Sequence, residues 1–148
     1  MITSIEEHAA VVVRREIRIA APINRVWHLH TDVNRWRDWQ ADIDTAYVDG
    51  PLRQGVTFHW STAGLQIAST VYAIDAPYRI LWGGPAHGIT GVHDWTFTAD
   101  GAATVVRTAE SWDGNAVRAD PDNLREALDA SLSSWLDHLR KTAENLTR

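Results

Sequence analysis

The sequence contains no cysteine, and this absence excludes several kinds of site. Without a thiol there is no disulfide, no thiolate nucleophile and no cysteine-ligated zinc. The seven histidines form no HExxH motif, and His28 and His30, two residues apart, point in different directions on a helix. Phosphate-binding loops, dinucleotide fingerprints and Gly-x-Ser-x-Gly elbows are also absent. We therefore expect a protein that binds no metal and needs no cofactor.

The sequence also has few basic residues and no long hydrophobic run. With 14 Lys and Arg against 19 Asp and Glu, the net charge is -5, and no segment gathers the cations that a phosphate backbone requires. The longest apolar run, about residues 9–13, is far shorter than the ~20 residues that span a bilayer. Glu6 and Glu7 stand where a signal peptide has basic residues. We expect a cytoplasmic protein without nucleic-acid binding or membrane insertion.

Tryptophan is the residue type present in excess. Eight Trp accompany only two Phe and three Tyr. Each such ring buries ~150–250 Å² in a core or an interface. A chain of 148 residues that is 45% hydrophobic, without repeats or linkers, has the size of one domain with a substantial core. We expect residues 1–148 to form a single domain, either as a monomer or as a homodimer.

The hydrophobic pattern predicts one strand, two short helices, six further strands and a long helix. Residues 11–20 alternate as in a strand, and Pro22 suits the first turn of a short helix. Asp32 can cap a second helix, residues 32–40, whose apolar residues recur at intervals of three. The later strands are separated by short turn signals, which fit antiparallel pairs. They are expected at residues 43–49, 56–62, 65–75, 78–83, 89–99 and 103–113.

The final segment, residues 122–146, has the pattern of a long amphipathic helix. Its large apolar residues repeat at spacings of three and four: Leu124, Leu128, Leu132, Trp135, Leu136 and Leu139. At 1.5 Å per residue, roughly 25 residues extend ~37 Å, which is enough to cross a whole sheet with one apolar face. We expect this helix to cover one face of the antiparallel sheet.

Residues 21–43, APINRVWHLHTDVNRWRDWQADI, closely resemble the opening of the polyketide cyclase/dehydrase family within the START-like, or SRPBCC, superfamily. The shared elements include Ala-Pro at the end of the first strand, Val26-Trp27, and the pair Trp36 and Trp39. Later segments resemble the family in the same order along nearly the whole chain. The resemblance implies an α+β helix-grip fold, in which a curved seven-stranded antiparallel sheet grips the C-terminal helix around a cavity. The family includes cyclases, aromatases, hydrolytic members and lipid or hormone carriers, so membership alone fixes no reaction.

The turn between the last two strands decides which of their residues share a face. With Gly101-Ala102 at its centre, His93 lies opposite Glu110, and with Asp100-Gly101 the two are diagonal neighbours. A three-residue loop would send Glu110 to the other face. Under either two-residue turn, the more apolar face carries Ile89, His93, Trp95, Phe97, Val106, Thr108, Glu110 and Trp112.

His93 and Glu110 are the candidate catalytic residues. A carboxylate among large aromatic rings loses hydration, and its charged form is disfavoured unless a partner compensates. His93 can be that partner, and the pair can then move protons at a ring hydroxyl or an enolisable carbon. The alternative is a hydrogen-bonded pair with a purely structural role. The sequence leaves both interpretations open.

Aromatic residues supply most of the candidates for ligand contact. Trp60, Trp82 and Trp95 fit a core position and a cavity wall equally well, whereas Trp135 fits ordinary docking of the long helix. Trp36 and Trp39 fit either a gate at the cavity mouth or an anchor for their own helix. The full set of ligand-binding candidates is Trp36, Trp39, Trp60, Trp82, Trp95, Phe97, Thr108, Trp112 and Trp135.

Three functions remain open at this point. The first is binding of a small hydrophobic metabolite, aromatic or polycyclic, in the cavity between the sheet and the C-terminal helix. The second is a cofactor-independent enzyme of the cyclase, aromatase or dehydratase type that uses the same cavity. The third is an interaction protein that engages a partner chain through exposed Trp36 and Trp39, which requires an apolar surface patch.

Overall fold

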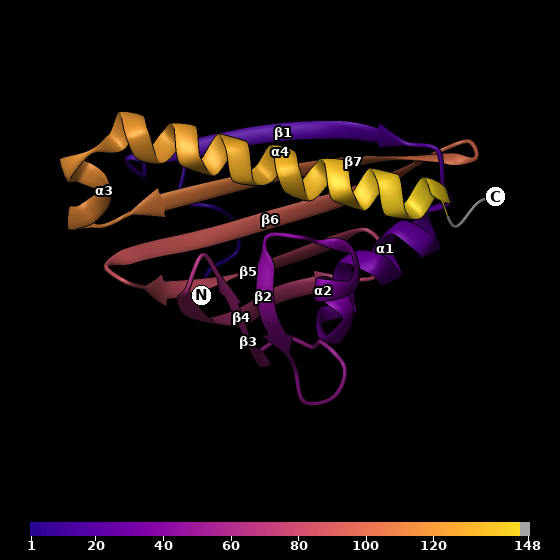
Figure 1. The fold of residues 1–148 in the computed structure, drawn as a ribbon, viewed down its shortest axis with the longest axis horizontal. Coiled ribbons are helices and arrows are strands. Elements are labelled where there is room, and N and C mark those ends of the chain that lie inside the picture. Colours follow the sequence, from indigo (N-terminus) through magenta and orange to yellow (C-terminus); the bar gives the residue numbers. More distant parts are fainter. Residues whose placement is uncertain (146–148) are drawn as a thin grey trace.

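A computed structural model describes residues 1–145 as a curved antiparallel sheet with a long helix along one face (Figure 1). This architecture confirms the predicted α+β fold class. Within the described residues the sheet has seven strands in the order β1-β7-β6-β5-β4-β3-β2. The strands are β1 (Val11–Ile19), β2 (Ile43–Tyr47), β3 (Thr57–Thr62), β4 (Leu65–Asp75), β5 (Arg79–Ala86), β6 (Ile89–Asp100) and β7 (Ala103–Asp113). The helical elements are α1 (Ile23–Thr31), η1 (Val33–Arg35), α2 (Trp36–Trp39), α3 (Asn115–Ala119) and α4 (Pro121–Asn145).

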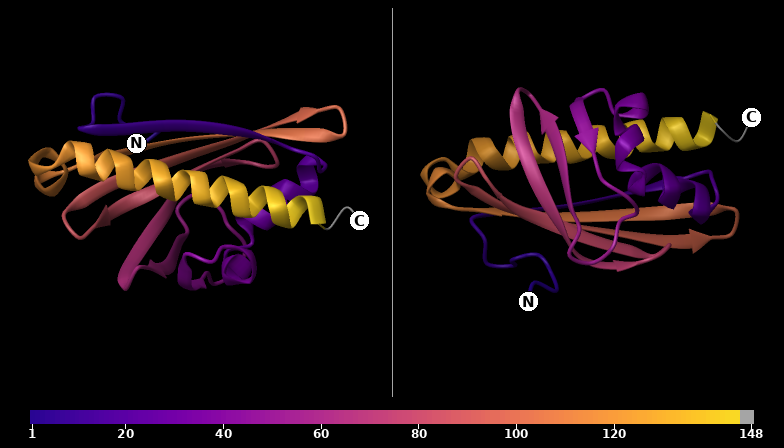
Figure 2. Two further views of the ribbon diagram at one scale, coloured as in Figure 1. Left: turned by 45° about the horizontal axis from the view of Figure 1, so that its top comes forward. Right: turned by 90° about the horizontal axis from the view of Figure 1, so that it is seen from below.

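Helix α4 buries the apolar stripe that its sequence predicted. Leu128, Leu132, Trp135, Leu136 and Leu139 are buried, while Leu124 near the start of the helix is half-buried. The helix begins at Pro121, where the missing N–H of proline costs no helical hydrogen bond. The predicted end at Leu146 lies outside the described residues. Figures 1 and 2 show α4 running along one face of the sheet over most of its length.

The predicted second helix at residues 32–40 is wrong in detail. The chain instead forms the 3₁₀ turn η1 followed by the single α-helical turn α2. Val33, Trp36 and Trp39 recur every three residues, which matches the three residues per turn of a 3₁₀ helix better than the 3.6 of an α-helix. All three side chains are buried. Periodicity also failed to predict α3, a five-residue helix between β7 and α4.

The N-terminal segment covers the face of the sheet opposite to α4 (Figure 2). Ile5 is buried there against Leu81 and Val92, which point out of the main core. The Arg79 guanidinium donates a hydrogen bond of 3.0 Å to the carbonyl oxygen of Thr3. This small second core means that the centre of the sheet is covered on both faces.

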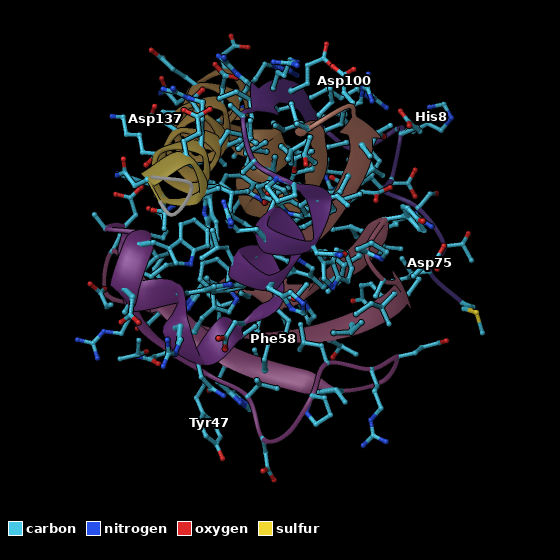
Figure 3. The ribbon with its side chains drawn as sticks, turned by 90° about the vertical axis from the view of Figure 1, so that its right-hand side faces the viewer. His8, Tyr47, Phe58, Asp75, Asp100 and Asp137 are labelled. Carbon is cyan, nitrogen blue, oxygen red and sulfur yellow. The ribbon has the colours of Figure 1, made fainter. Side chains whose placement is uncertain are left out.

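The sheet curves around an interior filled with side chains (Figure 3). The pairing of β4 with β5 shifts register between Val71 and Ala73, and extra residues of this kind bend a strand and increase its twist. Phe58 on β3 is buried, whereas Tyr47 on β2 points away from the body of the protein. The concave face therefore holds the core, and α4 closes it.

Candidate functional site

The β6–β7 hairpin brings the two candidate catalytic residues face to face. Asp100 pairs with Ala103, so Gly101 and Ala102 form a two-residue loop. Gly101 has a φ of 61°, a left-handed conformation that glycine adopts without strain. In this register His93 pairs directly with Glu110, as predicted for a turn centred on Gly101-Ala102.

Each oxygen of the Glu110 carboxylate has a nitrogen atom close to it. Nδ1 of His93 lies 2.7 Å from Oε1, and Nε1 of Trp112 donates to Oε2 at 2.6 Å. Glu110 is only 2% exposed, and a carboxylate this deeply buried requires such donors because it has lost its hydration. The bond from Trp112 was not part of the sequence prediction, which placed this residue on the same face without a partner.

The imidazole of His93 is held in place by aromatic neighbours. It stacks on the ring of Trp82, with 3.8 Å between ring centroids and 11° between ring planes. Trp60 meets the same imidazole edge-on at 6.5 Å. The carboxylate fixes one edge of the imidazole and Trp82 fixes its face, so the remaining ring nitrogen, Nε2, has a defined direction.

These residues form one wall of a cavity of about 200 Å³, which is partly open to solvent. Its apolar lining comes from β3 to β7 and from α4: Trp60, Leu65, Ile67, Trp82, Gly83, Gly84, Ala86, Ile89, Gly91, Trp95, Trp112, Leu132 and Trp135. Its polar lining consists of Thr62, Ser69, His87, His93, Glu110 and Ser131. His87 is exposed, and its Nε2 lies 2.9 Å from the carbonyl oxygen of Gln66. The cavity therefore combines aromatic walls with a few polar groups.

Five of the nine predicted ligand-contact residues line this cavity: Trp60, Trp82, Trp95, Trp112 and Trp135. The other four, Trp36, Trp39, Phe97 and Thr108, are buried but lie outside its lining. Phe97 packs edge-on against Trp27 of α1 at 5.3 Å, and the Thr108 hydroxyl is buried without a hydrogen-bond partner in residues 1–145.

Trp36 and Trp39 anchor their helical turns to α4. Their rings contact Trp135 edge-on at 4.9 and 5.7 Å, and Nε1 of Trp36 donates to the carbonyl oxygen of His30 at 2.8 Å. Their exposed fractions are 1% and 8%, because the three-residue repeat turns both rings toward the core. The exposed patch required by the interaction-protein hypothesis is therefore not present at these two residues.

His30 is a buried histidine for which the sequence predicted no role. Its ring lies 4.3 Å from Trp95, 5.5 Å from Phe97 and 6.4 Å from Trp36, measured between centroids. Neither ring nitrogen has a hydrogen-bond partner in the described part of the chain. Burial lowers the pKa of His30 to about 3, since the charged form has lost its hydration. His30 is therefore a neutral member of the aromatic core.

The described residues contain neither a metal-binding cluster nor a membrane-spanning helix. No three His, Asp or Glu side chains within residues 1–145 come close enough together to hold a metal ion. In that same part of the chain, no helix has the length and apolar character needed to cross a membrane.

Comparison with known proteins places this architecture in a family. Residues 10–144 match the family described as "Polyketide cyclase / dehydrase and lipid transport". The chain belongs to this family. The match covers almost the entire length and confirms the resemblance noted for residues 21–43. No match is found among proteins of curated function.

Solved structures share the fold at low sequence identity. A hypothetical protein from Helicobacter pylori aligns with a TM-score of 0.81 at 18% identity, covering 97% of this chain and 98% of its own. A START superfamily protein from Mycobacterium smegmatis aligns with a TM-score of 0.79 at 11% identity, covering 91% and 98%. The di-domain ARO/CYC StfQ from the steffimycin biosynthetic pathway aligns with a TM-score of 0.70 at 20% identity, covering 91% of this chain and 45% of StfQ.

Proposed function

We propose that the protein binds a small apolar molecule of one or two rings in the cavity between the sheet and α4. The observation that carries this proposal is the cavity itself, about 200 Å³ in volume and walled by five tryptophans. An apolar cavity of ~150 Å³ accommodates benzene, whereas drug-sized ligands occupy ~300–1,000 Å³. The volume therefore supports a single-ring or two-ring ligand.

The chemistry of the walls supports the same ligand class. Flat indole faces and edges contact a planar ring over a large area, and the loss of water from both surfaces drives binding. The family description includes lipid transport, and the START superfamily protein shares the fold. The family match and the shared fold are both consistent with binding of an apolar molecule.

Titration with naphthalene tests this proposal. We expect quenching of tryptophan fluorescence on binding, since indole rings line the cavity. We also expect a stabilisation of ~2.7 kcal/mol at 100 times the dissociation constant. For a chain of this size that corresponds to a rise in Tm of roughly 5–11 °C.

Neighbouring positions on α4 offer a matched pair of control variants. Ser131 lines the cavity, whereas Ala130 is exposed. Ser131→Trp should fill the cavity and abolish naphthalene binding, and Ala130→Trp should leave binding unchanged. The proposal is wrong if naphthalene does not bind the wild-type protein, or if it binds Ser131→Trp equally well.

A second candidate function is catalysis of the cyclase or dehydratase type. The observation that favours it is the 2.7 Å contact between His93 and Glu110 on the cavity wall. Such a pair suits proton transfer at a carbon next to a carbonyl group. Hydrogen–deuterium exchange at the acidic CH₂ of 2-tetralone measures this activity directly. Glu110→Gln should abolish protein-dependent exchange while 2-tetralone still binds, whereas a carrier should show no exchange above the buffer rate.

A further inference from the structure

We infer that the cavity selects ring compounds carrying a hydroxyl group, because Nε2 of His93 faces the ligand as a hydrogen-bond acceptor. This inference rests on the proposed ligand-binding function and names its ligand class, the phenols. It depends on which ring nitrogen of His93 carries the proton, on which direction Nε2 faces, and on which other polar groups the cavity offers.

The contact with Glu110 fixes the tautomer of His93. A neutral imidazole has one N–H donor and one nitrogen acceptor, and an ionised carboxylate only accepts. Glu110 accepts from Trp112 through Oε2 and faces Nδ1 of His93 through Oε1. With an ionised carboxylate at this contact, the proton of a neutral imidazole resides on Nδ1 and leaves Nε2 as the acceptor.

Gly91 leaves open the space in front of Nε2. A Cβ atom at residue 91 would lie 3.7 Å from Nε2 of His93 and 3.5 Å from Nε1 of Trp112. Gly91 and His93 are two residues apart on β6, and both line the cavity. With hydrogen in place of a side chain, a ligand atom can approach this nitrogen within hydrogen-bonding distance.

Two of the other hydroxyl groups in the lining already have hydrogen-bond partners within the protein. Ser69 accepts from Nε1 of Trp60 at 3.0 Å, and the Thr62 hydroxyl donates to the carbonyl oxygen of Asp42 at 2.6 Å. Ser131 lies half-buried on α4. The indole N–H of Trp95 also lacks a hydrogen-bond partner in residues 1–145, but this nitrogen is buried away from the open space of the cavity. A ligand hydroxyl group can donate to Nε2 of His93.

The test compares three ligands of similar shape: naphthalene, 2-methoxynaphthalene and 2-naphthol. Only 2-naphthol has a hydroxyl proton to donate. We expect it to bind between tenfold and a hundredfold more tightly than the other two, since a buried acceptor is satisfied only by this ligand. His59→Gln, which changes an exposed imidazole on β3, should leave all three affinities unchanged.

Two variants separate acceptor chemistry from packing. Gly91→Ala places a methyl group in ordinary van der Waals contact with Nε2 and should remove the preference for 2-naphthol while the protein stays folded. Glu110 acts as a positioning residue. In Glu110→Gln the amide NH₂ can donate to Nδ1, which moves the imidazole proton to Nε2 and turns it into a donor. The preference for hydroxyl over methoxy should then disappear, and ¹⁵N NMR of His93 should report the change of tautomer.

The outcomes distinguish this inference from the function on which it rests. If naphthalene binds but 2-naphthol and 2-methoxynaphthalene bind within threefold of each other, the inference is overturned and the binding function stands. A ¹⁵N spectrum of the wild-type protein that places the imidazole proton on Nε2 alone would likewise overturn the inference and leave the binding function intact. Failure of all three ligands to bind overturns both.

Discussion

Trp135 joins α4 to the rest of the aromatic core, and its replacement by alanine should be strongly destabilising. The ring is 6% exposed and contacts Trp36, Trp39, Trp60 and Trp95 at centroid distances between 4.9 and 6.4 Å. A tryptophan buries ~150–250 Å², which at ~25 cal/mol per Å² corresponds to ~4–6 kcal/mol. Partial collapse of the resulting cavity brings the expected loss to ~3–5 kcal/mol. For a chain of about 150 residues, Tm should fall by roughly 6–20 °C.

Urea unfolding followed by circular dichroism at 222 nm measures this loss without depending on tryptophan emission. Tyr47→Ala is the control, because Tyr47 is 59% exposed and points away from the body of the protein (Figure 3). Its stability should change by less than about 0.5 kcal/mol. A loss below ~1.5 kcal/mol for Trp135→Ala, or one equal to that of Tyr47→Ala, would refute the assignment of Trp135 as the contact that holds the core to α4. The variant should also accept ligands larger than naphthalene, since Trp135 forms part of the cavity wall.

Two further predictions concern His30 and Gly83. His30 has a pKa of about 3 in the folded protein and about 6.5 when unfolded, so only the unfolded chain takes up this proton between those values. The stability that neutral His30 contributes is present above its unfolded pKa of 6.5 and is lost as the pH falls. The free energy of unfolding should therefore decrease by about 2 kcal/mol between pH 7 and pH 5 because of this residue. In His30→Leu, urea titrations at these two pH values should show a smaller decrease. At Gly83 a Cβ atom would lie 2.1 Å from the backbone oxygen of Gly91, so β5 and β6 must separate to admit it. Gly83→Ala should lose at least ~1–3 kcal/mol in chemical denaturation, and an unchanged midpoint would contradict the packing of these strands.

The sequence determined the order of the strands and of the long helix, and it placed His93 near Glu110 for either two-residue turn. Both depend on local rules. Apolar periodicity distinguishes strand from helix, and a two-residue turn fixes the register of the strands that it joins. Once Gly101-Ala102 forms the loop, every residue of β7 has a defined partner on β6. The recurring leucines of α4 likewise required no tertiary information to indicate which side of the helix is buried.

The tertiary structure alone decided which aromatic rings line the cavity and which fill the core. Trp36 and Trp95 are both buried tryptophans, yet of these two only Trp95 lines the cavity. The position of the cavity depends on how α2, α4 and the bent strands pack against one another. The volume of the cavity arises from the same long-range packing. So does the cover that Ile5 provides on the outer face. A periodic pattern specifies one face of one element at a time, and the shape enclosed between elements follows only when all of them are packed.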